Sequence, residues 1–206
     1  MIPKLILDSW QRVNKRIDEF CGGDSSNSFK MLFITDVHIG LENAHHIHQL
    51  RYVGELLKLN PVDLVVNGGD IGLDVGEDLI EAQRVLDITE KATQYDVPYF
   101  YCKGNHDHKP AIFNDYKLML KLNKCFMNID PSIGKIVLDE NKSSGYGYYI
   151  DKKTDTKIIF LNTCDNLRGF DLSNEQLEFV IKTLEENEQS NVILIGHYCL
   201  NECGGW

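Results

Sequence analysis

The sequence lacks the long apolar run that a membrane-spanning segment would need. No stretch of its 206 residues approaches the roughly 20 consecutive apolar residues required to cross a bilayer. The N-terminus also lacks a secretory signal, because the short run Leu5-Ile6-Leu7 ends at Asp8. These absences predict a protein that has no membrane partner and lies in the cytoplasm.

Paired cysteines are also missing. The six cysteines include no Cys-x-x-Cys pair, and Cys199 and Cys203 have no second pair of Cys or His nearby, which disfavours a zinc knuckle. Cys102 and Cys164 lie in or beside apolar runs, so we expect both to be small buried side chains. Scattered thiols of this kind are typical of a reducing compartment.

Basic residues are fewer than acidic residues. Lysine and arginine together number 21 against 31 acidic residues, which gives a net charge of -10. This balance argues against broad, non-specific binding of nucleic acid, because nothing offsets phosphate repulsion over a large face. A hydrophobic content of 43% with 25% charged residues is ordinary for a globular protein, so extensive disorder is not expected.

The apolar pattern divides the chain into an N-terminal appendage, residues 1–30, and a domain, residues 31–206. Within residues 2–20, apolar side chains recur at spacings of three and four: Ile6, Trp10, Val13, Ile17 and Phe20. That spacing predicts an amphipathic helix, and the Gly- and Ser-rich stretch 22–28 predicts a flexible connector. We expect the apolar stripe of the helix to pack on the chain's own domain, with a partner surface as the alternative.

From residue 31 onward, short apolar runs alternate with longer amphipathic stretches. The apolar runs predict strands at residues 31–35, 63–67, 98–102, 146–150, 157–162 and 191–195. The longer stretches predict helices at about 44–59, 77–95, 111–122 and 173–187, and the last of these begins with a capping box, Ser173 and Gln176. The alternation predicts an α/β protein with a largely parallel sheet over its first half, whereas residues 145–163 predict an antiparallel hairpin.

Four of the predicted strands end at side chains that can bind metal ions. The segments concerned are Asp36-Val37-His38, Gly68-Gly69-Asp70, Gly104-Asn105-His106-Asp107 and Gly196-His197. Functional groups in open α/β sheets collect beyond the carboxyl ends of the strands, so we expect these side chains to meet. Asp36 and His38 are two residues apart and point to the same side of an extended backbone, where both could bind one ion.

The types of donor indicate the chemistry of the site. Carboxylate, carboxamide and imidazole groups without a thiolate suit Mn²⁺, Fe or Zn²⁺. Asp70, shared by its position, would hold two ions about 3.5–4 Å apart, the separation used for in-line phosphoryl displacement. Each segment alone has a simpler interpretation, since an Asp after a strand is often a helix cap and a lone His is more often structural. Because all four segments come directly after predicted strands, in this order, the sequence favours a metal site.

The motifs Asp-x-His, Gly-Asp, Gly-Asn-His-Asp and Gly-His, in that order, resemble the calcineurin-like metallophosphoesterase superfamily over about residues 31–199. The resemblance implies a four-layer α/β/β/α sandwich of two mixed sheets, with a dinuclear centre at the strand ends. It implies two divalent metal ions with five ligands: Asp36 and His38 on the first ion, Asp70 bridging both, and Asn105 and His197 on the second.

The same resemblance assigns roles in catalysis and substrate binding. It implies that His106 lies over the substrate phosphate beside Asn105, where it stabilises charge or protonates the leaving oxygen. Asp107 is expected to orient His106. A histidine suits this donor role because its ordinary pKa lies near neutrality.

The sequence departs from the family pattern at one point. Family members carry a further Gly-His-x-His motif, some tens of residues after the first Gly-His, which supplies one histidine to each ion. This chain ends at Trp206, nine residues past His197, without that motif. Either the chain is a fragment of a longer protein or the site has lost two ligands, and we expect the former. An incomplete site is expected to hold metal more weakly.

The implied activity is hydrolysis of a phosphate mono- or diester by a dinuclear centre that activates a bridging hydroxide. The expected substrate is a small phosphorylated molecule such as a nucleotide. Two alternatives stay open. One is a nuclease with the same chemistry, which the acidic charge disfavours. The other is a catalytically inactive scaffold of the same fold, against which the intact Asn105-His106-Asp107 segment argues.

Overall fold

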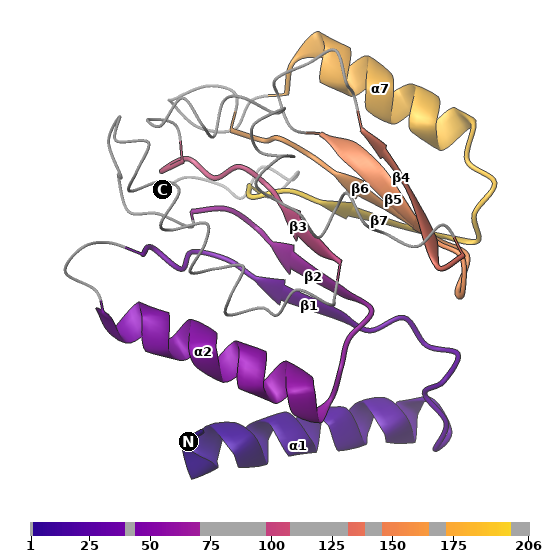
Figure 1. The fold of residues 1–206 in the computed structure, drawn as a ribbon. Helices are drawn as coiled ribbons and strands as arrows, with labels where there is room; N and C mark the ends of the chain where they lie inside the picture. Colours follow the sequence, from indigo (N-terminus) through magenta and orange to yellow (C-terminus); the bar gives the residue numbers. More distant parts are fainter. Residues whose placement is uncertain are drawn as a thin grey trace.

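A computed structural model describes residues 2–39, 44–70, 98–107, 132–138, 146–164 and 172–198. Two sheets carry the architecture, one of order β1-β2-β3 and one of order β4-β5-β6-β7 (Figure 1). The elements and their bounds are α1 Lys4–Phe20, β1 Met31–Ile34, α2 Ala44–Leu59, β2 Leu64–Asn67, β3 Tyr99–Tyr101, β4 Gly134–Leu138, β5 Gly147–Asp151, β6 Thr156–Phe160, α7 Asn174–Glu185 and β7 Asn191–Ile195. The helices predicted at 77–95 and 111–122 lie outside the described residues.

The first sheet is parallel throughout its described strands. Strand β1 pairs with β2 in the register Met31 to Leu64, and β2 pairs with β3 in the register Val65 to Tyr99. Residues 64–67 of the central strand are all buried, as parallel strands covered on both faces are. Since the three strands run the same way, their carboxyl ends share one edge, and the parallel arrangement predicted for the first half is confirmed.

The second sheet is mixed. Strands β5 and β6 form the predicted antiparallel hairpin, and β7 then pairs with β6 in parallel. Strand β4 was not predicted from the sequence; it lies antiparallel to β5 and occupies the edge of the sheet. At Gly134 an added Cβ would come within 2.4 Å of the ring of Tyr149, so this strand leaves room for a ring from its neighbour. Such a long-range requirement is invisible in a five-residue segment.

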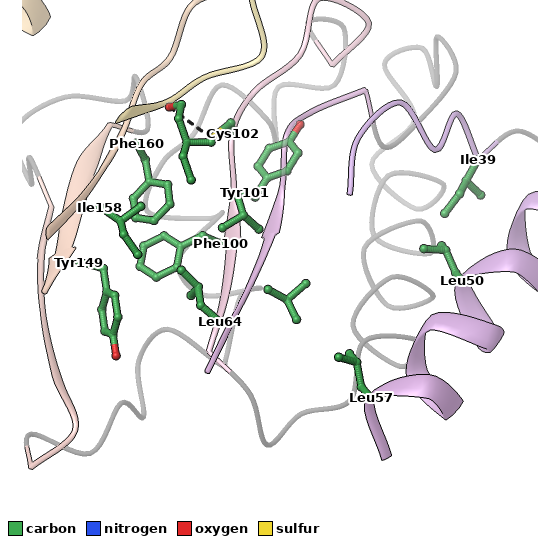
Figure 2. Close-up of a cluster of buried hydrophobic side chains, with 13 residues drawn as sticks. Ile39, Leu50, Leu57, Leu64, Phe100, Tyr101, Cys102, Tyr149, Ile158 and Phe160 are labelled. Atoms are coloured by element: carbon green, nitrogen blue, oxygen red, sulfur yellow. Dashed lines mark hydrogen bonds between the residues drawn. The ribbon is translucent and has the colours of Figure 1, made fainter. Parts of the chain in front are cut away.

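The hydrophobic core lies between the two sheets (Figure 2). Phe100 of β3 stacks on Phe160 of β6 with ring centroids 3.9 Å apart and planes inclined by 11°. Cys102 and Cys164 are buried as predicted, and burial, as the largest cause, raises the pKa of each thiol to about 12. The core therefore joins strands from opposite sheets into one packed layer.

Helices cover the outer faces of both sheets. Leu50 and Leu57 of α2 belong to the same cluster as the first sheet, whereas Val180 of α7 packs with Ile159 and Leu161 behind the second sheet. Figure 1 shows α2 and α7 on opposite sides of the pair of sheets. The predicted four-layer α/β/β/α sandwich is confirmed, although only the second sheet is mixed among the described strands.

The N-terminal helix α1 contacts the domain along one side only. The indole nitrogen of Trp10 donates to Asn60 Oδ1 at 3.0 Å, at the end of α2, and the ring packs against the core cluster. Two members of the predicted apolar stripe stay exposed, Val13 at 51% and Phe20 at 94%, and Leu5 is 75% exposed. The division of the chain into an appendage over 1–30 and a domain over 31–206 stays a prediction. Among the described residues, no helix has the length and apolar character to cross a bilayer.

Candidate metal centre

The loops after β1 and β2 are bound to each other through their backbones. The amide of Asp36 donates to the carbonyl of Gly69 at 3.0 Å, and the amide of His38 donates to the carbonyl of Asp70 at 2.9 Å. Asp36, His38 and Asp70 have φ angles of 56°, 46° and 53°, in the left-handed region that non-glycine residues seldom adopt. The two loops therefore fix one another in turns that direct these three side chains to a common place.

Two glycines allow the loops after β2 and β3 to touch. A Cβ on Gly69 would lie 2.5 Å from the amide nitrogen of Gly104, and Gly69 has a φ of 106°. A Cβ on Gly104 would lie 2.1 Å from Asp70 Oδ1. Because neither position has room for a side chain, the glycines of these motifs are required for the close approach that places Asp70 between the neighbouring loops.

Three donor atoms form a first group. Donor atoms of Asp36, His38 and Asp70 all lie within 4.8 Å of one another. His38 Nε2 is 3.8 Å from Asp36 Oδ1 and 3.9 Å from Asp70 Oδ2. Ligands bound at about 2.0–2.2 Å to a common ion lie roughly 3–4 Å apart, so these spacings fit one divalent cation.

A second group of donors shares Asp70 with the first. His197 Nε2 is 3.5 Å from Asp70 Oδ2 and 2.9 Å from Asn105 Oδ1. His197 Nδ1 lies 2.8 Å from the carbonyl oxygen of Gly68; with the proton on Nδ1, Nε2 carries the lone pair that a metal ligand needs. Three acceptor atoms then face one another, and a bound cation would satisfy all of them.

Asp70 is the centre of the arrangement. Both histidines direct Nε2 toward the same oxygen, Asp70 Oδ2, while Oδ1 accepts from the amide of His106 at 2.8 Å. The side chain of Asp70 is only 3% exposed, whereas that of Asp36 is 51% exposed. One buried carboxylate thus lies between two groups of donors, and the site opens to solvent on the Asp36 side. All five residues predicted as ligands are brought together; their binding of metal stays a prediction.

The remaining predicted residues have different surroundings. The ring of His106 meets the ring of His38 edge-on, with centroids 5.1 Å apart, beside the first group of donors. Asp107 is buried, and its Oδ2 accepts from the amides of Asp70 at 2.7 Å and Gly104 at 2.8 Å. These contacts make Asp107 a clamp between two loops, and its expected action on His106 stays a prediction.

The environment of Asp107 opposes its negative charge. Burial, the largest cause, raises the pKa of this carboxyl above its ordinary value, and the charge of Asp70 acts in the same direction. The Tyr101 hydroxyl and the amides of Gly104 and Asp70 lower the pKa and oppose that effect. The clamp therefore holds its two loops at an electrostatic cost.

The predicted helix cap at Ser173 is present, since its hydroxyl accepts from the amide of Gln176 at 3.2 Å. Two contacts near it, made by Gln176 and Tyr198 after the ends of β6 and β7, were not predicted. The buried side chain of Gln176 also accepts from the amide of Asn162 and donates to its carbonyl, each at 2.8 Å. Tyr198, which directly follows the Gly-His motif, donates its amide to Thr163 Oγ1 at 2.9 Å. Adjacency to His197 is the one sequence signal that could have drawn attention to Tyr198.

Comparisons with known proteins agree with this geometry. The family model of calcineurin-like phosphoesterases matches residues 29–206. No curated protein matches the sequence significantly. A solved dimetal phosphatase from Danio rerio is similar, with 15% identity and a TM-score of 0.58, over 85% of this chain and 71% of that chain. A purple acid phosphatase from seeds of yellow lupin (Lupinus luteus) is similar, with 17% identity and a TM-score of 0.52, over 84% of this chain and 31% of that chain. At such identities the two structures show a shared fold.

Proposed function

This chain belongs to the calcineurin-like phosphoesterase family, whose members are metal-dependent hydrolases of phosphoesters, and on that premise we propose the site and substrate of the reaction. The substrate is a small phosphate mono- or diester, such as a nucleotide. Two divalent metal ions are bound at the strand ends. Their ligands are Asp36 and His38 for the first ion, Asp70 for both, and Asn105 and His197 for the second.

The convergence of acceptors on Asp70 Oδ2 is the observation that supports this proposal most. His38 Nε2 and His197 Nε2 lie 3.9 and 3.5 Å from this single oxygen. The side chain of Asp70 is only 3% exposed, and a buried carboxylate is costly in a protein interior unless its charge is paired. Two bound cations remove that cost and account for the placement of all five side chains.

Metal ions in such a site polarise phosphoryl oxygens and lower the pKa of a bound water. The protein's own residues hold the geometry and move the proton. His106, beside the first donor group, is positioned to donate a proton to the leaving oxygen. Asp107 keeps Asp70 in place by binding its amide and that of Gly104.

The chemistry of the donors and the charge of the chain narrow the assignment. Oxygen and imidazole ligands with no thiolate favour manganese, iron or zinc. The net charge of -10 disfavours a long nucleic acid as substrate and favours a small molecule. We place the activity in the cytoplasm, in accord with the scattered free thiols.

The test is metal stoichiometry combined with turnover. Metal-free protein titrated with Mn²⁺ or Zn²⁺ is expected to bind two ions and to hydrolyse p-nitrophenyl phosphate or bis(p-nitrophenyl) phosphate. His106→Ala is expected to keep both ions and lose most of the rate, about 10²–10⁴-fold for removal of a general acid. Asp36→Asn is expected to weaken the binding of the first ion.

Asp155 offers a matched control for Asp36. Asp155 also has a positive φ, of 51°. It lies in the turn between β5 and β6, outside the candidate site, and its carboxylate accepts a hydrogen bond from the amide of Ser190. Asp155→Asn is therefore expected to leave metal binding unchanged. Two bound ions without turnover of either ester would favour the inactive scaffold, and absence of metal binding would contradict the site itself.

A further inference from the structure

Tyr198 is held rigidly beside the second group of donors. Its ring meets the ring of His197 edge-on, with centroids 5.1 Å apart and planes inclined by 67°. Its amide is anchored on Thr163 Oγ1, and a Cβ on Gly196 would lie 2.8 Å from the methyl group of Thr163. The turn after β7 is thus packed closely against the end of β6, which fixes the backbone that carries Tyr198.

The arrangement repeats a pattern found at the first group of donors. There, the ring of His106 meets the ring of His38 edge-on, also with centroids 5.1 Å apart. Each of the two histidines that approach Asp70 therefore has a second polar ring against its edge. His106 packs against the ring of His38, and Tyr198 packs against the ring of His197.

The phenol of Tyr198 lies next to the second group of donors. It packs against the ring of His197, whose Nε2 is 2.9 Å from Asn105 Oδ1 and 3.5 Å from Asp70 Oδ2. A phenol is a hydrogen-bond donor at neutral pH, whereas the five predicted ligands offer acceptor atoms.

A phosphate ester needs donors as well as cations. Its peripheral oxygens carry negative charge, and hydrogen bonds to a charged acceptor are stronger than neutral ones. We propose that Tyr198 contacts the substrate, its hydroxyl donating a hydrogen bond to a non-bridging oxygen of the phosphoryl group. This inference rests on the proposed phosphoesterase function. No proton is transferred; the phenol binds the phosphate and stabilises it as charge develops.

The test compares Tyr198→Phe with Tyr148→Phe. The first substitution removes the hydroxyl and keeps the ring against His197. The control removes a hydroxyl from a half-buried ring on β5 that packs against Phe179 and Lys157, on the α7 side of the second sheet. For Tyr198→Phe, we expect kcat/KM for p-nitrophenyl phosphate to fall about 10- to 100-fold, the size of one hydrogen bond to a charged group. The dissociation constant of inorganic phosphate should rise about 10-fold or more.

Metal stoichiometry and the unfolding midpoint should stay at wild-type values in both variants, and Tyr148→Phe should keep wild-type kinetics. Unchanged kcat/KM and phosphate affinity in Tyr198→Phe would overturn the inference while leaving the phosphoesterase function intact. Loss of metal from Tyr198→Phe would also overturn it, because the residue would then act by supporting His197. If the wild type binds metal without turnover, the proposed function fails; phosphate affinity, measured by calorimetry on the metal-loaded proteins, still decides the role of Tyr198. A metal-loaded wild type that binds no phosphate would overturn both.

Discussion

The clamp at Asp107 allows a quantitative test of what holds the site together. Its Oδ2 accepts the amides of Asp70 at 2.7 Å and Gly104 at 2.8 Å, and the residue is 1% exposed. Asp107→Ala would leave both amides buried without this acceptor, and each such loss costs about 1–3 kcal/mol. Removal of an unfavourable buried charge offsets part of that cost. We expect a net destabilisation of about 2–4 kcal/mol.

Asp107→Asn separates the hydrogen bonds from the charge. The amide oxygen of asparagine can accept both backbone bonds, and its NH₂ group faces the Tyr101 hydroxyl, which already influences this carboxyl. Since a neutral side chain avoids the burial penalty, Asp107→Asn should be at least as stable as the wild type at pH 7. Without metal, the clamp therefore depends on an acceptor at residue 107 and does not require a charge.

The pH dependence follows from the direction of the shift. The pKa of Asp107 in the folded protein is raised above the ordinary value of an aspartate, so the unfolded chain releases this proton more readily. The contribution of this group to stability is fully present below the unfolded pKa and is lost as pH rises through the folded pKa. The advantage of Asp107→Asn over the wild type should therefore be absent near pH 3 and grow toward neutrality.

Urea unfolding in the presence of a chelator measures these differences, with thermal unfolding as a second readout. For a chain of this size, a loss of 3 kcal/mol lowers Tm by roughly 6–12 °C. The reasoning would be refuted if Asp107→Asn were as damaging as Asp107→Ala. It would also be refuted if Asp107→Ala kept wild-type stability, because the two amides would then have found other partners.

Three further substitutions test other contacts. Gly104→Ala places a methyl group 2.1 Å from Asp70 Oδ1, so we expect loss of metal binding in calorimetric titration. The control is Gly22→Ala, whose methyl group meets nothing within 4 Å and whose strain comes from its own positive φ of 70°. Gln176→Leu leaves the backbone of residue 162 without its two bonds and should cost about 2–4 kcal/mol in urea unfolding, whereas an unchanged midpoint would contradict the assigned contact. Trp10→Phe loses one hydrogen bond to the end of α2 and should cost about 1 kcal/mol while ester hydrolysis stays unchanged; a fall in turnover would link α1 to the site.

The positions of the candidate ligands were predictable because they follow from sheet geometry. Asp36, Asp70 and Asn105 each come after a strand of one parallel sheet, and parallel strands end at a common edge. His197 comes after β7 of the other sheet, yet its ring reaches Asn105 at 2.9 Å and the carbonyl of Gly68 at 2.8 Å. Motif order and strand periodicity were sufficient to predict that these donors meet.

Other features depend on contacts between distant segments and could not be predicted. Strand β4 has little periodicity of its own, and its place is fixed by pairing with β5. The direction of the Asp107 side chain is set by two amides, one of them 37 residues away in sequence. A short polar segment gives no information on which of its side chains turns inward, so the family resemblance implied that Asp107 orients His106 and gave no sign that it binds two backbone amides.

Backbone strain gives an independent argument that these loops are built for ligands. Among the described residues, four non-glycine positions have positive φ, and three of them, Asp36, His38 and Asp70, form the first group of donors. Each such conformation costs about 1–3 kcal/mol and persists only where the surroundings enforce it. Here the enforcement comes from the hydrogen bonds of Asp36 and His38 to the loop of Gly69 and Asp70. Glycine at these positions would relieve the strain and make the folded loop more stable. It would also remove the oxygen and nitrogen atoms that can bind an ion. Strain concentrated at the donors, with Asp155 in a turn as the fourth position, is therefore the expected result of selection for ion binding against backbone preference.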